Sequence, residues 1–143
     1  MNKSSFEEVL ARDGRLVYTN VGDSMLPLIR EGRDLLVIEP PRGRLKQYDI
    51  PLYRRDSGHY VLHRVLEVRE DGYVLCGDNR WSKEYGVMDR QIIGVLTGLV
   101  RDGKERRLAG WKYRLYVFFW CRLFPLRAFF LKVRYVLKRM MIR

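Results

Sequence analysis

The sequence predicts a small, mainly β domain: a compact, strongly bent β-sheet preceded by a short helix and followed by a basic, amphipathic helical tail. Short apolar or alternating runs of about five to ten residues recur between turn residues from position 15 to position 100, as in compact β domains. A helix-capping pattern precedes these runs, and residues 111–143 combine aromatic and basic side chains with helical spacing. We therefore expect two units, a β domain over residues 1–110 and a helical tail over residues 111–143.

A short helix is predicted over residues 5–12. Ser5, followed three residues later by Glu8, has the pattern of a capping box, and Gly14 ends the helical pattern. The first ten residues contain no apolar run, so the pattern of a cleavable secretory signal or of an N-terminal transmembrane helix is not found there.

Six strands are predicted after this helix, each as an apolar or alternating run bounded by turn residues. They cover residues 15–20, 34–39, 49–54, 59–68, 73–76 and 92–100. Residues 59–77 are expected to form a hairpin around Glu70-Asp71-Gly72, with His63 in the middle of its first strand. Residues 80–90 are expected to be a loop.

The positive charge is concentrated in the predicted tail. The 143 residues carry a net charge of +11, and residues 111–143 contain nine Lys or Arg and no Asp or Glu. The β domain is therefore close to neutral, and only the tail is expected to meet an anionic partner. With 47% hydrophobic and 31% charged residues, the chain does not have the composition of a disordered protein.

The tail is predicted to form two helical halves separated by Pro125. Its longest uncharged run, residues 115–121, has seven residues, whereas a membrane-spanning helix needs about 20. Arg127, Arg134 and Lys138 fall on one stripe of the second half, and apolar side chains cover much of the rest. This composition favours a basic amphipathic helix pair in the membrane interface. The alternative is a helix packed on the β domain or on a partner, with its basic face in solvent.

The sequence contains no predicted metal site. The two cysteines, Cys76 and Cys121, lack the spacing of metal ligands and are expected to be reduced structural thiols. His59 and His63 would lie about 13 Å apart on one strand, too far to bind one metal ion. We therefore expect no metal and no cofactor.

Three short segments contain residue types used in nucleophilic catalysis. Gly22-Asp23-Ser24, followed by Pro27, would hold a serine on a fixed turn. Leu62-His63-Arg64 places a histidine in an apolar strand. Gly77-Asp78-Asn79 contains a carboxylate, and Glu84 follows in the next loop. Taken singly, each has an ordinary structural explanation: a helix cap, a buried core histidine and a turn. A catalytic interpretation depends on the combination.

The order of these segments resembles the signal peptidase I family. The resemblance is greatest to its endoplasmic-reticulum and archaeal-type branch, in which a histidine stands where bacterial enzymes have a catalytic lysine. It covers roughly residues 20–100 and implies a mixed, mainly β peptidase fold shared with LexA-like self-cleaving repressors. The matching segments are Ser24-Met25-x-Pro27, His63-Arg64-Val65, Gly77-Asp78-Asn79, and more loosely Glu31-Gly32-Arg33-Asp34, Tyr48-Asp49-Ile50 and Ile92-Ile93-Gly94.

The resemblance implies a role for each matching residue. Ser24 would be the nucleophile and His63 its general base, and the Ser24 N–H would help to hold the oxyanion. Asp78 matches one acidic position of the family, whereas Glu84 stands where the family has a second Asp, and either would orient His63. Asp89 is a weaker candidate. The residues expected at the substrate or the oxyanion are Asp23, Met25 and Pro27.

The predicted function is a serine endopeptidase that removes a leader or signal-like segment from a peptide or protein substrate. The tail would attach it to a membrane surface, as a peripheral protein on the cytoplasmic face. The alternative is a catalytically silent module of the same fold that holds a peptide or a partner. A self-cleaving regulator would need a DNA-binding domain, and residues 1–20 are too short for a helix-turn-helix. No nucleic-acid partner is expected, although charge alone would allow the tail to bind one.

Overall fold

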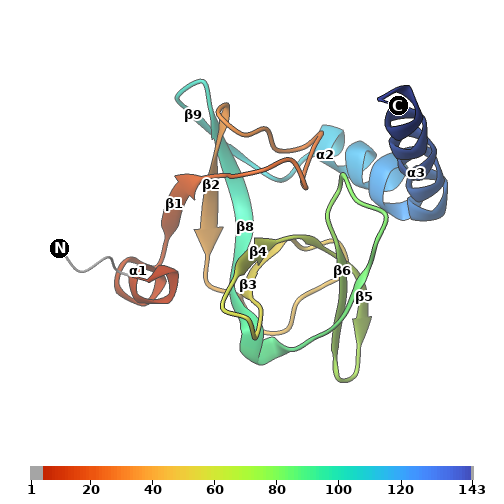
Figure 1. Cartoon of the computed structure of the whole chain (residues 1–143). Coiled ribbons are helices and arrows are strands. Elements are labelled where there is room, and N and C mark those ends of the chain that lie inside the picture. The colour runs from red at the N-terminus through yellow and green to blue at the C-terminus, as the bar shows by residue number, and fades with distance from the viewer. Residues whose placement is uncertain (1–4, 143) are drawn as a thin grey trace.

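The computed structural model describes residues 5–142, and its architecture is mainly β, as predicted. Two antiparallel sheets form the body of the molecule, with helices at opposite sides (Figure 1). The six-stranded sheet contains β1 (Leu16–Thr19), β2 (Asp34–Glu39), β3 (Pro51–Arg54), β4 (Tyr60–Leu62), β8 (Ile92–Arg101) and β9 (Lys104–Arg107). The three-stranded sheet contains β5 (Arg64–Arg69), β6 (Gly72–Cys76) and β7 (Glu84–Val87).

The long strand β8 is the spine of the larger sheet. Its second half pairs with β2 and β9, and its first half pairs with β3, which gives the order β1-β2-β8-β3-β4 with β9 on β8. The register shifts between Val37 and Ile38 and again between Leu52 and Tyr53. Such bulges increase the local bend and twist of a sheet. In the order β1-β2-β8-β3-β4, strands β1 and β4 stand at the two ends, so each of them pairs with a neighbouring strand on one side only.

The N-terminal helix α1 (Phe6–Asp13) confirms the predicted capping box. The Glu8 N–H donates to the Ser5 hydroxyl at 3.2 Å, and the Ser5 N–H donates to the Glu8 carboxylate at 3.0 Å. Gly14 ends the helix in the left-handed region, with φ 67°. Leu10 is the residue of α1 that is buried against the larger sheet.

Two predictions for the middle of the chain are wrong. The run 59–68 is not one strand: β4 ends at Leu62, β5 begins at Arg64, and the two belong to different sheets. The run 80–90 is not only a loop, because it contains β7 and the short 3-10 helix η1 (Asp89–Gln91). In both places the pairing partner decides the outcome, since β4 pairs with β3 while β5 and β7 pair with β6.

Two clusters of buried side chains form the core. The first lies under α1 and the larger sheet, and its members include Leu10, Met25, Ile29, Leu52, Leu62 and Leu96. The second joins the two sheets and contains Leu45, Tyr53, Val65, Tyr73, Leu75 and Val87. Because the neighbouring residues Leu52 and Tyr53 of β3 belong to different clusters, the larger sheet is packed on both faces at this strand. Cys76 and Cys121 are buried free thiols.

The C-terminal helices are α2 (Trp111–Tyr116), the π-helical segment η2 (Val117–Arg122) and α3 (Phe124–Met141). The chain bends at Leu123, and Pro125 follows in the first turn of α3, which matches the predicted division of the tail. Arg127 does not belong to an exposed basic stripe, because its side chain is buried against the β domain. No helix within residues 5–142 is both long enough and apolar enough to cross a bilayer.

Candidate active site

Ser24 lies in the connection from β1 to β2, on a turn whose underside is buried. Met25 and Ile29 belong to the first core cluster, and the Ile29 N–H donates to the Met25 carbonyl at 2.9 Å. Gly22 adopts φ 93°, a conformation open to glycine, and its N–H donates to the Glu31 carboxylate at 3.0 Å. The turn is therefore held on both sides of Ser24, which itself stays partly exposed.

The loop of residues 77–80, which follows β6, holds the Ser24 turn from the side. The Asn79 N–H donates to the Ser24 carbonyl at 2.8 Å, and the Asn79 side-chain amide donates to the Asp23 carbonyl at 3.1 Å. Arg80 reaches the Asp23 carboxylate at 2.6 Å. A Cβ atom on Gly77 would lie only 2.6 Å from the Ser24 carbonyl oxygen, so the close approach of the two segments requires glycine.

His63 is the residue at which the chain leaves the larger sheet and enters the smaller one. The same Cβ position on Gly77 would lie 3.2 Å from His63 Cδ2, so both Ser24 and His63 border Gly77. Since Cδ2 is bonded to Nε2, this edge of the ring faces Gly77, in the loop that holds the Ser24 turn. Among the described residues, no hydrogen bond joins the Ser24 and His63 side chains.

The imidazole of His63 is held in its neutral form. Burial lowers the pKa of His63 to about 4, against smaller effects of the carboxylates of Glu84 and Asp78, which raise it. Within residues 5–142, His63 Nε2 makes no hydrogen bond. This nitrogen is not fully buried, and the residue as a whole is partly exposed. A neutral imidazole with an accessible ring nitrogen has the properties of a general base at neutral pH.

Tyr53 on β3 orients the other ring nitrogen. Its hydroxyl oxygen lies 3.4 Å from His63 Nδ1 and donates its proton to the Glu84 carboxylate at 2.5 Å. Burial, with Glu84 beside it, raises the pKa of Tyr53, so the phenol keeps that proton. The phenol oxygen is then the acceptor for a proton on Nδ1, and the lone pair of the imidazole lies on Nε2.

Glu84 therefore meets His63 through Tyr53 and not directly. Its carboxylate also accepts two hydrogen bonds from Arg55, both 2.9 Å long. Burial raises the pKa of Glu84, but the hydrogen bonds from Arg55 and Tyr53 outweigh it, and the net pKa is lowered. The result is an ordered chain of polar groups, from Arg55 through Glu84 and Tyr53 to the imidazole.

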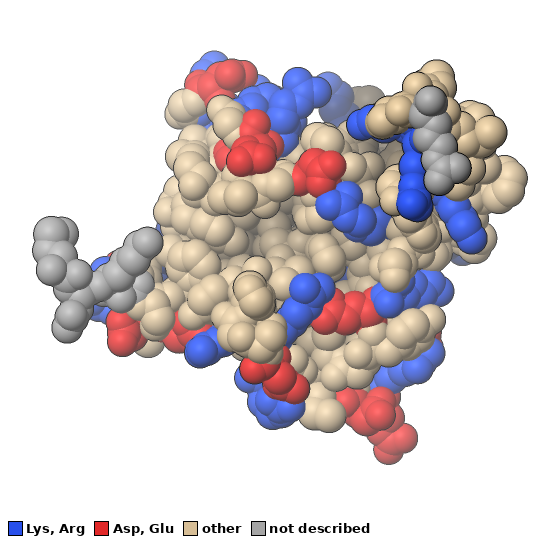
Figure 2. All heavy atoms as spheres, viewed as in Figure 1, with Lys and Arg blue, Asp and Glu red and all other residues tan. Residues whose placement is uncertain are grey.

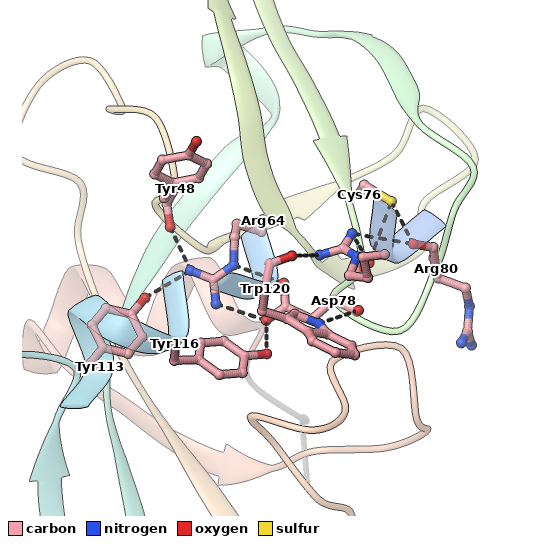
Figure 3. A network of polar contacts seen from close by, with 10 residues as sticks. Tyr48, Arg64, Cys76, Asp78, Arg80, Tyr113, Tyr116 and Trp120 are labelled. Carbon is pink, nitrogen blue, oxygen red and sulfur yellow. Dashed lines mark hydrogen bonds and ion pairs between the residues drawn. The ribbon is translucent and has the colours of Figure 1, made fainter. Parts of the chain in front are cut away.

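Asp78 is occupied by a different partner. It is fully buried, and both its carboxylate oxygens accept hydrogen bonds of 2.8 Å from the equally buried guanidinium of Arg64 (Figure 3). Tyr116 adds a third hydrogen bond, also of 2.8 Å, to one of these oxygens. Among the described residues, Asp78 makes no hydrogen bond to His63. Asp89, the weaker candidate, accepts a hydrogen bond from Tyr73.

The three residues expected near the substrate lie in three different environments. The Met25 side chain is buried in the core and does not line the groove beside Ser24. Pro27 lines another hollow together with Leu28 and Tyr116, and Asp23 is tied to the 77–80 loop. Within residues 5–142 the Ser24 N–H donates to no protein acceptor, so it is free to donate to an oxyanion.

A groove of about 250 Å³ runs beside Ser24. It is lined from one side by residues of β1 and the loop after it, and from the other by β4, the two end strands of the larger sheet. Its walls are largely uncharged, and Figure 2 shows a hollow of mostly uncharged surface in the middle of this face. The side chains that form its floor and walls include Phe6, Tyr18, Leu52, Tyr60 and Leu62.

Two site residues, Tyr53 and Arg55, were not predicted from the sequence. Tyr53 was expected only as part of a strand, and Arg55 lies 29 positions before its partner Glu84. No local pattern in the sequence indicates that pairing. His59, by contrast, lies in the exposed connection between β3 and β4, where its Nδ1 is 2.9 Å from the Ser57 hydroxyl. No group of three His, Cys, Asp or Glu side chains in the described part of the chain is arranged to hold a metal ion.

Comparisons of the chain with protein-family models, with curated proteins and with solved structures each found no match. The fold and the site therefore define the class of the protein only as far as a mainly β domain with a serine and a neutral histidine on neighbouring segments.

Proposed function

We propose that the protein is a serine endopeptidase of the signal peptidase I type, with Ser24 as nucleophile and His63 as general base. The observation that carries the proposal is the state of His63. Its imidazole is neutral, and its Nδ1 side is oriented by Tyr53. Its Nε2 side has no hydrogen-bond partner within residues 5–142 and lies beside Gly77, in the loop that holds the Ser24 turn. An imidazole that is held at one nitrogen and is partly exposed at the other is suited to act as a general base.

In the proposed reaction, Ser24 Oγ attacks the carbonyl carbon of the scissile bond and gives its proton to His63 Nε2. The Ser24 N–H, which is free in the described structure, donates to the oxyanion that forms. The carbon–nitrogen bond then breaks, and the imidazolium returns the proton to the leaving amine. Water, deprotonated by the same imidazole, hydrolyses the acyl-serine ester and restores Ser24.

The groove beside Ser24 supports a peptide as the substrate. Strands β1 and β4 each have one unpaired edge, and an extended segment in the groove could add main-chain hydrogen bonds to such an edge. The uncharged walls favour a segment with apolar side chains. A leader or signal-like segment has this chemistry, and we propose it as the substrate class.

The experiment is a cleavage assay on a pool of apolar, signal-like peptides, with new N-termini identified by mass spectrometry. Wild type is compared with Ser24→Ala and with Ser82→Ala, an exposed serine that serves as a matched control. Ser24-dependent cleavage that survives Ser82→Ala supports the proposal. Peptide binding without cleavage, measured by fluorescence anisotropy, would favour the silent binding module instead. Cleavage that persists in Ser24→Ala would exclude Ser24 as the nucleophile.

We also propose that the C-terminal helices attach the enzyme to an anionic membrane surface. Large apolar side chains on these helices are exposed, among them Trp111, Phe119, Leu126, Phe129, Phe130 and Met140. They share the helices with basic side chains and with no acidic ones, and in Figure 2 basic groups flank the uncharged outer side of α3. Aromatic and basic groups together suit the interface of a bilayer with anionic headgroups, such as the cytoplasmic leaflet.

Sedimentation with vesicles tests this attachment. The protein should sediment with vesicles that contain anionic lipid, less so with zwitterionic ones, and the double variant Phe129→Ser/Phe130→Ser should stay in the supernatant. Tyr85→Ser, which removes an exposed aromatic side chain from β7, is the control and should bind like wild type. A protein that stays in the supernatant with both kinds of vesicle would overturn this part of the proposal, leaving a protein partner as the occupant.

A further inference from the structure

The C-terminal helices are bound to one small part of the β domain. Within residues 5–142, every hydrogen bond between these helices and the rest of the protein ends on Arg64 or on the 77–80 loop. Figure 3 shows these contacts converging from the helices on one side. The two contacted elements are Arg64, which follows His63 and donates to Tyr113, and the loop whose Asn79 N–H donates to the Ser24 carbonyl.

Asp78 is the centre of these contacts. Its carboxylate binds Arg64 on one side and the Tyr116 hydroxyl on the other, each at 2.8 Å. Its backbone carbonyl accepts a hydrogen bond of 2.8 Å from the Trp120 indole. Tyr113, also from α2, binds the Arg64 guanidinium at 2.9 Å. Because Arg64 and Asp78 are both fully buried, their charges need hydrogen-bond partners within the protein, and the helices supply part of them.

Arg127 of α3 adds a second set of contacts on the same loop. Its guanidinium donates to the backbone carbonyls of Gly77 at 3.4 Å and Arg80 at 3.3 Å, and to the Trp120 carbonyl at 3.2 Å. Arg127 is buried, so its charge is satisfied mainly by carbonyl groups whose position it in turn restrains. The loop is therefore gripped by the helices at its first, second and fourth residues.

The same loop grips Ser24 from its other side. Asn79, directly after Asp78, donates to the Ser24 and Asp23 carbonyls, and Arg80 binds the Asp23 carboxylate. Gly77 lies so close to both site residues that an added Cβ would be 2.6 Å from the Ser24 carbonyl oxygen and 3.2 Å from His63 Cδ2. A shift of the loop would thus move the nucleophile relative to its base, and misplacement by about 1 Å is enough to cost about 10²-fold in rate.

We infer that the C-terminal helices are a clamp for the catalytic geometry, and that Tyr116 and Trp120 are positioning residues for Ser24 and His63. This inference rests on the proposed peptidase function. It assigns the helices a role inside the enzyme, in addition to any membrane that they meet: the buried face of α2 and η2 holds the 77–80 loop, and the exposed face remains free for the bilayer.

The first test uses hydrogen exchange, which does not depend on activity. Tyr116→Phe removes one donor to Asp78 and keeps the ring. Trp120→Phe removes another donor and keeps an aromatic side chain, although a smaller one, so both variants are expected to fold. The Asn79 amide, which donates to Ser24, should exchange about tenfold faster in each variant. Tyr135→Phe, on an exposed position of α3, is the control and should exchange like wild type. Unchanged protection of Asn79 in both variants would overturn the inference.

The second test uses kinetics with a soluble peptide that wild type cleaves. Both variants should lower kcat about tenfold or more and leave KM nearly unchanged, because the substrate groove is intact. Vesicle binding should equal that of wild type. An unchanged kcat with accelerated exchange would reject the catalytic role of the clamp, whereas a wild type that cleaves nothing would reject the proposed function itself and leave the exchange result standing.

Discussion

The hydroxyl oxygen of Tyr53 lies 3.4 Å from Nδ1 of His63, at the point where the chain crosses between the two sheets. Tyr53 is fully buried, and its own proton is directed to Glu84. In a serine hydrolase the group beside Nδ1 fixes the tautomer of the base. Here that neighbour is the phenol of Tyr53, which is hydrogen-bonded to the Glu84 carboxylate. Glu84 therefore affects the imidazole through Tyr53 and not by direct contact.

Tyr53→Phe should slow the reaction without unfolding the protein. The variant keeps the buried ring but removes the acceptor for His63 Nδ1 and the donor to Glu84. The loss of one modest hydrogen bond corresponds to about a tenfold decrease in kcat/KM. The comparison is with Tyr85→Phe, an exposed tyrosine on β7, in the same peptide assay. Equal rates for the two variants would show that Tyr53 does not orient the base.

The pH dependence of activity follows from the low pKa of His63. In the proposed mechanism the base is the neutral imidazole, so kcat/KM should be level from about pH 5 to neutrality and fall roughly tenfold for each pH unit below about 4. An acid limb near 6.5, the ordinary value for histidine, would mean that His63 is solvated in the working enzyme.

The same shift affects stability with a definite sign. The folded-state pKa of His63 lies below its unfolded value, so burial of the neutral ring stabilises the fold most above about pH 6.5 relative to acid. That contribution is lost as the pH falls from about 6.5 to about 4. Denaturant titrations of wild type and His63→Gln across this range isolate it, because the variant lacks the titrating ring. Parallel curves for the two proteins would contradict the shift.

The buried pair Arg64–Asp78 should behave as a unit in unfolding. Asp78→Leu leaves the guanidinium of Arg64 buried without its carboxylate, and a loss of about 3–5 kcal/mol in the free energy of unfolding is expected. Arg64→Met should lower the free energy of unfolding by a similar amount. The double variant should lose less than the sum of the two single losses. Additive losses in the double-mutant cycle would mean that the two charges do not stabilise one another.

Gly77→Ala should damage the site more than the fold. The added Cβ would lie 2.6 Å from the Ser24 carbonyl oxygen and 3.2 Å from His63 Cδ2, so it must push the two apart. We expect a loss of about 10²-fold or more in kcat. Gly94→Ala is the matched control, because its Cβ would meet Ile38 and Glu39 in the larger sheet. If Gly94→Ala lowered kcat as much as Gly77→Ala for the same loss in the free energy of unfolding, the effect at Gly77 would be one of stability alone.

The local elements were predictable because short-range chemistry decides them. The capping box at Ser5 and Glu8 needs only neighbouring residues, and the apolar run of β2 was predicted with its observed bounds. The same holds for the division of the tail at Pro125. Strand β7 was missed because Glu84 and Gly86 interrupt its pattern, and only pairing with β6 makes the segment extended.

The sequence by itself determined the mainly β class, the short first helix, the charge asymmetry of the tail and Ser24 and His63 as the candidate pair. Only the tertiary structure decided which carboxylate serves which partner: Asp78 went to Arg64, and Glu84 reached His63 through Tyr53. It also turned Arg127 inward, onto the carbonyls of the 77–80 loop. The physical reason is that these contacts join residues 10 to 50 positions apart, and the burial that makes each pairing necessary exists only once the sheets and helices have packed.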